Sequence, residues 1–417
     1  MKLPTILFTS ICLLLAGTLT AQRRDTAARL QPNTSAMEET RQISAPHTNG
    51  LKYIKTLGGA YLNSGNGTDR LGGNKIGFLE SGIVMEVIED EGSLYKVRLS
   101  DNRYAFIPKE YAADTAAADF LPVITSGSIS VANAGATDRI SIALEQKRCY
   151  IIREEVEPEK MIIELYGVQN NSNWITQYLD LESVDRIDIA QVDSDILRLT
   201  VYLKNRSCWG YSVKYEGGRL VIDIKHAPEL RLKGMVIGVD AGHGGPDNPG
   251  ARGVGSLVDE KDLNLDMALR LKRILESKGA RVVLARDKDT SLTMAERKAI
   301  FLENNIDMLI SIHCNAGGTA SGTSTYYKHI QNRMFAKSLL ESILKIKGVK
   351  LFGLVGNFNF SLNAPTEYPN ALVETLFLSH PQDEARLNDP VFREQIMKQV
   401  AKGVKNYLKY CRKQEKR

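Results

Sequence analysis

The chain has 417 residues, of which 43% are hydrophobic, 25% are charged and 7% are aromatic. This length exceeds one ordinary domain and suits two or three, and the composition is that of globular proteins with substantial cores. The formal net charge of +5 is only mildly basic. It suits an anionic surface or polymer but lacks the strongly basic footprint of a nucleic-acid-binding protein, so we expect no nucleic-acid partner.

Residues 1–21 have the layout of a secretory signal peptide. Lys2 precedes an apolar run at residues 6–19, and small residues end at Ala21. The run is too short to span a bilayer comfortably and is typical of an exported protein; a buried helix is the alternative. Residues 22–49 are predicted to be a flexible linker. No later stretch suits a membrane span, so we expect an exported protein of the periplasm or cell envelope without a transmembrane anchor.

Two regions with strand periodicity follow. Residues 50–113 contain short alternating runs, such as SLYKVRLS and RYAFIP, separated by Gly, Asn and Asp turns, which predict a small β-barrel. Residues 120–228 contain seven alternating runs, including RISIALE and ILRLTVYL, which predict a β-sandwich. Cys149 and Cys208 fall in this second region, where they either form a disulfide or remain two buried thiols.

The pattern changes after Pro228, where strands alternate with helices. Residues 232–411 are therefore predicted to form an α/β domain with a mostly parallel sheet covered by helices, in a multidomain chain. The stretch 348–370 is expected to be a loop that either lines the substrate groove or is purely structural. Strands are expected at 235–240, 281–285, 308–313, 323–327 and 371–377, and helices at 260–278, 293–304, 332–346 and 390–410.

Side chains that can bind a metal follow or flank these strands. His243 lies in a glycine-rich turn after the first strand, His313 ends the third, and Glu260 opens the first helix. The carboxyl ends of strands in an α/β sheet line a common crevice, so we expect these residues to meet. Two imidazoles and one carboxylate are a usual set for one catalytic Zn²⁺. Asp259 and Asp262 are alternatives to Glu260 as the acidic ligand.

Glu374 is the expected catalytic carboxylate. It lies inside the apolar run ALVETLF, where a charge is costly unless it is paired or near a metal. Its expected role is to take a proton from water and pass it to the leaving nitrogen of an amide. Cys314 and His313 are neighbours in sequence, but adjacent residues on a strand point to opposite faces, so a Cys-His nucleophile is not expected.

Residues 232–411 resemble the zinc-dependent N-acetylmuramoyl-L-alanine amidases of the autolysin and cell-division type. The resemblance implies that His243, Glu260 and His313 bind zinc and that Glu374 is the catalytic glutamate. It also implies cleavage of the amide between N-acetylmuramic acid and L-alanine in peptidoglycan, for wall remodelling or daughter-cell separation. His380 departs from the family, which often has asparagine there. The matching motifs are DAGHGG with GARG, ARDKDTSLTMAER, ISIHCNA, GTSTYY and PNALVETLFLSHPQDE.

The expected partner is peptidoglycan, with divisome or activator proteins as further candidates. Asn315 and Tyr326 are expected to contact the substrate. Some family members carry a helical insert that blocks the zinc, but only NAGGTAS separates His313 from the next strand, so we expect no such gate. Two alternatives to the amidase stay open: a zinc peptidase acting within the stem peptide, and a catalytically dead peptidoglycan-binding protein.

The two N-terminal regions have resemblances of their own. Residues 50–113 resemble bacterial Src-homology-three-like domains, and serve either to bind the wall or as a spacer. Residues 120–228 resemble the AMIN-type localisation domains that precede some cell-wall amidases.

Overall fold

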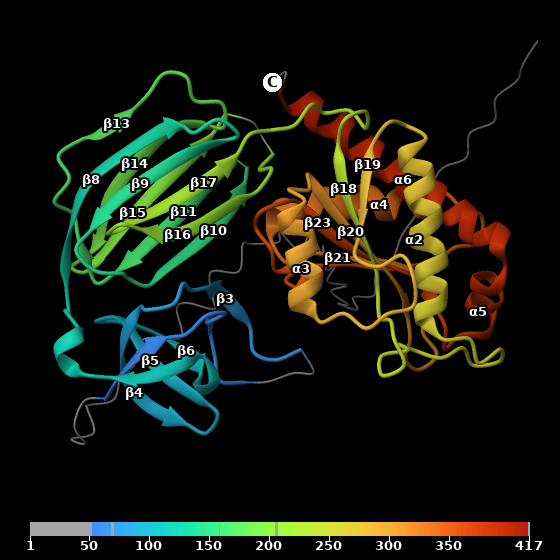
Figure 1. The fold of residues 1–417 in the computed structure, drawn as a ribbon, viewed down its shortest axis with the longest axis horizontal. Coiled ribbons are helices and arrows are strands. Elements are labelled where there is room, and N and C mark those ends of the chain that lie inside the picture. The colour runs from blue at the N-terminus through green and yellow to red at the C-terminus, as the bar shows by residue number, and fades with distance from the viewer. Residues whose placement is uncertain (1–51, 68–70, 158, 205–206, 416–417) are drawn as a thin grey trace, which may run out of the picture. The chain divides into compact units, whose positions relative to one another are not determined.

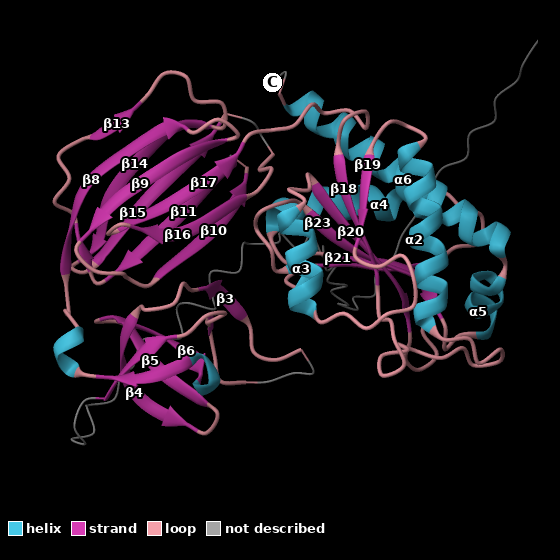
Figure 2. Cartoon of the chain, in the orientation of Figure 1, coloured by secondary structure: helices cyan, strands magenta, loops and turns pink. Residues whose placement is uncertain are grey.

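The structure, a computed structural model, describes residues 52–67, 71–157, 159–204 and 207–415. The expected signal peptide and linker lie outside these residues. Strands and short 3₁₀ turns make up the described chain as far as Lys225, and α-helices begin at Glu260 (Figure 2). None of the helices in the described ranges is long and apolar enough to cross a bilayer.

The first part is an antiparallel sheet with the strand order β3-β2-β6-β5-β4-β1-β7. Along β5 the side chains of Tyr95, Val97 and Leu99 are buried while Lys96 and Arg98 are partly exposed, as the period of two along a strand requires. This alternation agrees with the sequence pattern. The strands are β1 (Lys52–Thr56), β2 (Tyr61–Asn63), β3 (Lys75–Phe78), β4 (Val84–Glu91), β5 (Leu94–Ser100), β6 (Arg103–Pro108) and β7 (Ala112–Thr115).

The second part contains two sheets, one ordered β10-β11-β15-β14 and the other β12-β8-β9-β17-β16, with β13 paired to β8. Cys149 and Cys208 are buried free thiols, so they do not form a disulfide with each other. The strands are β8 (Ile124–Asn133), β9 (Thr137–Leu144), β10 (Tyr150–Val156), β11 (Glu159–Tyr166), β12 (Val168–Gln169), β13 (Ile175–Gln177), β14 (Val184–Asp193), β15 (Ile196–Leu203), β16 (Tyr211–Glu216) and β17 (Arg219–Lys225).

The third part is built on a sheet with the order β19-β18-β20-β23-β21-β22 (Figure 1). Neighbouring strands are parallel except for β21 and β23, which are antiparallel. The expectation of a loop throughout 348–370 was wrong, because residues 351–355 form the edge strand β22. The strands are β18 (Val236–Ala241), β19 (Arg281–Leu284), β20 (Met308–Asn315), β21 (Thr323–Tyr326), β22 (Leu351–Val355) and β23 (Asn370–Phe377).

Helices cover both faces of this sheet. Ile310 and Ile312 of β20 belong to the core formed with α2, α4 and α6, whereas Leu309 joins Phe301 of α3 in a separate core. The sheet is therefore buried on both faces, which explains its nearly continuous apolar strands. The helices are α2 (Glu260–Glu276), α3 (Met294–Glu303), α4 (Arg333–Ile343), α5 (Pro381–Asn388) and α6 (Pro390–Gln414). The sequence expectation contained no helix at α5.

Two helices that cover the same face, α4 and α6, approach each other closely at a glycine. A Cβ atom on Gly403 of α6 would lie 2.7 Å from the Cα atom of Leu339 and 2.9 Å from the carbonyl oxygen of Ser338. Both contacts are to the backbone of α4, which cannot move aside as a flexible side chain can. Glycine at this position thus sets the distance between the two helices.

We predict that Gly403→Ala lowers the free energy of unfolding by about 1 kcal/mol. The higher helix propensity of alanine contributes about 1 kcal/mol in favour of the variant, but overpacking of a tight core costs about 1–3 kcal/mol. Chemical denaturation measures the net effect. The control is Gln395→Ala at an exposed site on the same helix, where a change of less than about 0.5 kcal/mol is expected. A stabilised Gly403→Ala protein would contradict the prediction.

Candidate metal and catalytic centre

The first candidate ligand, His243, lies in the turn that follows β18. Its φ of +62° is in the left-handed region, which non-glycine residues seldom adopt. The neighbouring Gly242 permits close packing, since a Cβ atom there would lie 2.2 Å from the ring of His313. His243 Nδ1 is 2.7 Å from Asn248 Oδ1, which accepts its hydrogen bond. That bond orients the ring so that Nε2 faces Glu260, where it can bind a metal.

Two buried arginines hold the backbone of this turn. The Arg297 guanidinium, which is fully buried, pairs with Asp240 and donates hydrogen bonds to the carbonyl oxygens of Ala241 and His243. Arg286 donates to the carbonyl oxygens of Ala241, at 3.0 Å, and Gly242, at 3.0 Å. Because both guanidinium groups are rigid and planar, they fix the direction of the peptide units that carry His243.

Sequence reasoning assigned no role to Arg286 or Arg297, although both lie in the motif ARDKDTSLTMAER. One signal was available for Arg297. It stands four residues before Phe301 on α3, and thus on the buried face of that helix. A charged residue in such a position needs a buried partner. The partner, Asp240, lies near the end of β18 and is 57 residues away in sequence, so it was not apparent from local spacing.

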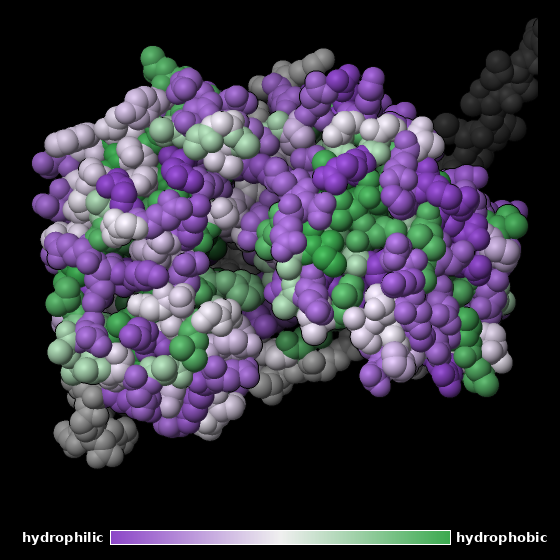
Figure 3. Space-filling view, in the orientation of Figure 1, coloured by the Kyte–Doolittle hydropathy of each residue, from purple (hydrophilic) through white to green (hydrophobic). Residues whose placement is uncertain are grey.

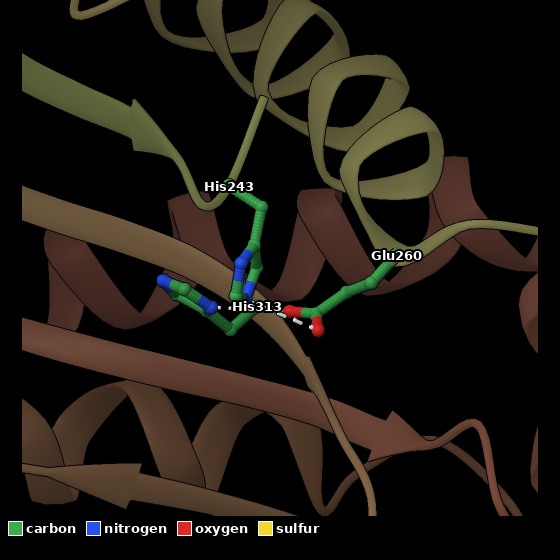
Figure 4. A group of neighbouring side chains, drawn as sticks. All are labelled: His243, Glu260 and His313. Carbon is green, nitrogen blue, oxygen red and sulfur yellow. Dashed lines mark hydrogen bonds and ion pairs between the residues drawn. The ribbon is translucent and has the colours of Figure 1, made fainter. Parts of the chain in front are cut away.

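Glu260, the first residue of α2, lies between the two histidines. Its Oε2 is 3.2 Å from His243 Nε2, and its Oε1 is 3.1 Å from His313 Nδ1 (Figure 4). The backbone N–H groups of Ala251 and Cys314 also donate to this carboxylate. Burial alone would raise the pKa of the Glu260 carboxyl, but the hydrogen bonds of the two histidines outweigh it and hold the pKa well below its usual value. The group is therefore an anion at neutral pH.

The two alternative acidic ligands lie elsewhere. Asp259 forms an ion pair with Arg252 at 2.8 Å, and the side chain of Asp262 is exposed. The structure thus places Glu260, and neither of its neighbours, against the histidines. The carboxylate is delivered there because Glu260 begins the helix, where its backbone N–H bonds to the Ala251 carbonyl oxygen.

His313 completes the group of candidate ligands. It lies on β20, and its ring centroid is 5.0 Å from that of His243. The three candidate ligand atoms of His243, Glu260 and His313 lie within 4.8 Å of one another. Burial lowers the pKa of His313, but the hydrogen bond to Glu260 more than compensates, so the net pKa is raised to about 9. Two nitrogen donors and one anionic oxygen, already converged, suit a divalent metal such as zinc.

Glu374 lies beside this group on the neighbouring strand. In the parallel pairing of β20 with β23, Glu374 is the register partner of His313. Directly paired residues point to the same face of a sheet, so the carboxylate and the imidazole are neighbours. Glu374 is 8% exposed. The position is therefore shielded but reachable, as a general base requires.

The other sequence-predicted residues lie around the end of β20. Asn315 Nδ2 is 3.3 Å from the hydroxyl oxygen of Tyr326, which is only 7% exposed. Substrate contact by this pair stays a prediction. The Cys314 thiol is buried 3.4 Å from Thr375 Oγ1, on the opposite side of the strand from His313, and burial raises its pKa well above its usual value. Cys314 is thus not an activated nucleophile, as expected.

Comparison with known proteins identifies the family of this chain. The sequence model of the N-acetylmuramoyl-L-alanine amidases matches residues 237–406. The germination-specific N-acetylmuramoyl-L-alanine amidase of Bacillus subtilis is 31% identical over 203 residues, which are 43% of this chain and 82% of the relative. The amidase LytC of the same species is 31% identical over 204 residues, which are 46% of this chain and 40% of LytC.

Among solved structures, the catalytic domain of the amidase CwlV from Bacillus (Paenibacillus) polymyxa var. colistinus is 32% identical, covering 42% of this chain and 98% of that domain, with a TM-score of 0.40. The sequence relationship carries the assignment: the match to the germination-specific amidase extends over most of that relative, and the family model spans the strands and helices that bear the site. The chain belongs to the N-acetylmuramoyl-L-alanine amidase family, whose members are hydrolases of peptidoglycan.

Proposed function

We propose that residues 232–411 form a zinc-dependent amidase domain that cleaves the bond between N-acetylmuramic acid and L-alanine in peptidoglycan. The observation that carries the proposal is the convergence of His243, Glu260 and His313 beside Glu374. Zinc is favoured over calcium or magnesium because those ions prefer oxygen ligands, whereas two of the three donors here are nitrogen. When bound, zinc supplies Lewis acidity, which lowers the pKa of water and polarises a carbonyl group.

The protein's own residues account for the remaining steps. His243, Glu260 and His313 would hold the ion, and the hydrogen bonds of Asn248, Arg286 and Arg297 keep the first of these ligands in place. Glu374 takes the proton of the attacking water on its carboxylate and then donates it to the nitrogen of L-alanine as the amide bond breaks. One residue thus serves as base and then as acid. The presence of the three candidate ligands together with Glu374 argues against the alternative of a catalytically dead binding protein.

We also propose that the chain acts in the cell envelope, exported by the signal peptide at 1–21. Relatives in Staphylococcus that are 31% identical are named probable cell wall amidases, which supports this location. Residues 50–113 would be a Src-homology-three-like module and residues 120–228 an AMIN-like sandwich, consistent with one antiparallel sheet in the first part and two sheets in the second. An activator or divisome partner stays a prediction.

The experiment that tests the function is digestion of purified peptidoglycan with the wild type and with Glu374→Gln. We expect the wild type to release intact stem peptides beginning at L-alanine, identified by mass spectrometry. The variant should lose roughly 10²–10⁴-fold in rate, because proton transfer is removed while the ligands remain, and its zinc content should be unchanged. Glu303→Gln, at an exposed site on α3, is the matched control. Products cut within the stem peptide would establish the peptidase instead.

A second prediction concerns pH. In the metal-free protein His313 is protonated below about pH 9, and zinc must displace that proton. Apparent zinc affinity should therefore rise with pH, by up to about tenfold per unit, until about pH 9. The protonated form of His313 also stabilises the folded protein. Its contribution to the free energy of unfolding is fully present below the unfolded pKa of about 6.5 and is lost as pH rises through 9. Competition with a chelator at several pH values measures the affinity; a flat profile between pH 6.5 and 9 would contradict this.

A third prediction concerns Arg297, a positioning residue that acts through the backbone of His243. Arg297→Lys keeps the charge but cannot bond both carbonyl oxygens and Asp240 with the same geometry. We expect zinc affinity to fall about tenfold, the lower end of the effect of groups that orient ligands. Zinc titration against a chelator gives the affinity, and circular dichroism checks the fold. Arg281→Lys, at an exposed site, is the control; equal affinities for both variants would refute the positioning role.

A further inference from the structure

A groove between α2 and α6 is lined mainly by cationic side chains. It has a volume of about 760 Å³. The cationic residues that line it are Arg273, Lys278, Lys398, Lys402, Lys405, Lys409 and Arg412. Glu394 is the one carboxylate among its lining residues, and it already pairs with Arg273 at 3.5 Å and with Lys398 at 3.6 Å. The groove therefore carries a concentrated positive charge, although the net charge of the whole chain is only +5.

Helix stability does not account for this arrangement. Lys398 and Lys402, and likewise Lys405 and Lys409, are four residues apart on α6, and like charges at this spacing destabilise a helix. The helix dipole favours cations only within the last turn, where Arg412 lies. In the described part of the chain, Lys402, Lys405 and Lys409 form no ion pair that would offset their mutual repulsion. An external anion would relieve it.

The shape and chemistry of the groove indicate which kind of anion fits. The four lysines of α6 follow one another at intervals of three or four residues, so they recur about every 4.5–6 Å along the helix axis. Only Ile274 and Ala401 are hydrophobic among the lining residues, and Figure 3 shows mainly hydrophilic residues near the C-terminal end of α6. Peripheral membrane helices instead bury an apolar face in the lipid. A concave, charged and poorly hydrophobic surface suits a linear anionic polymer rather than a bilayer.

We propose that this groove binds a flexible linear polyanion of the cell envelope, with one charged group per repeat, and so retains the enzyme near its substrate. The envelope location rests on the proposed function. The groove lies far from the chemistry, because Arg273 is thirteen residues along α2 from Glu260, which is about 20 Å at 1.5 Å per residue. A polyanion bound in the groove should thus change where the enzyme is held but leave the reaction at the metal centre unaltered.

The test uses the full chain and long-chain inorganic polyphosphate as the probe. We expect Lys402→Gln/Lys405→Gln/Lys409→Gln to bind it at least tenfold more weakly than the wild type in fluorescence anisotropy. Binding by the wild type should weaken steeply as salt rises, because exposed charges are screened. The control, Lys345→Gln/Lys347→Gln/Lys350→Gln, removes the same charge from exposed sites outside the groove and should bind like the wild type.

Two outcomes would overturn the proposal. Equal loss of polyphosphate binding in both triple variants would show that only net charge matters. Tighter binding of the wild type to anionic phosphatidylglycerol vesicles than to polyphosphate would identify a membrane surface as the partner. Hydrolysis of a small soluble muramoyl peptide is measured in parallel and should be equal in all three proteins. If the wild type does not hydrolyse this peptide, the proposed function is refuted, whatever the groove binds.

Discussion

The hydrogen-bonded contact of one carboxylate with two imidazoles is the interaction on which this site depends. Glu260 is 3% exposed, and an unpaired anion in such a place would be strongly unfavourable. His243 and His313 approach its two oxygens separately, and both contacts stabilise the anion. The same atoms are the donors that a metal would bind. A cation bound at this site would replace these hydrogen bonds by coordination to the same atoms.

This pairing is possible only because the backbone around His243 is constrained. A histidine with a φ of +62° is in an uncommon conformation, and the cost must be offset by its surroundings. The buried Arg286 and Arg297 supply the compensating bonds at the carbonyl oxygens of the turn. Arg286 also donates to the carbonyl oxygen of Lys261 at 2.8 Å, which ties the turn to the first turn of α2. The ring of His243 and the carboxylate of Glu260 are thus positioned by one side chain.

Much of the site could be predicted from the sequence because it follows a general rule of α/β folds. The turn after β18 and the end of β20 lie at the same edge of the sheet, so His243 and His313 were expected to meet. The features that were missed depend on tertiary contacts. The edge strand β22 exposes Leu351 and Phe352 and thus shows no simple buried pattern, and the buried partner of Arg297 is distant in sequence. Local spacing left Asp259 as an alternative to Glu260, and the ion pair of Asp259 with Arg252 excludes that alternative.

Helix α2 connects the two features that the structure reveals in this domain. Its first residue, Glu260, belongs to the candidate metal centre, and its C-terminal end contributes Arg273 and Lys278 to the basic groove. Leu263, Met267 and Leu271 bury one face of the helix, so it is held rigidly against the sheet along this length. A rigid helix fixes the distance between the groove and the metal centre. Because that distance is about 20 Å, the groove would act through where the enzyme is held, while the rate of amide cleavage would depend on the metal centre alone.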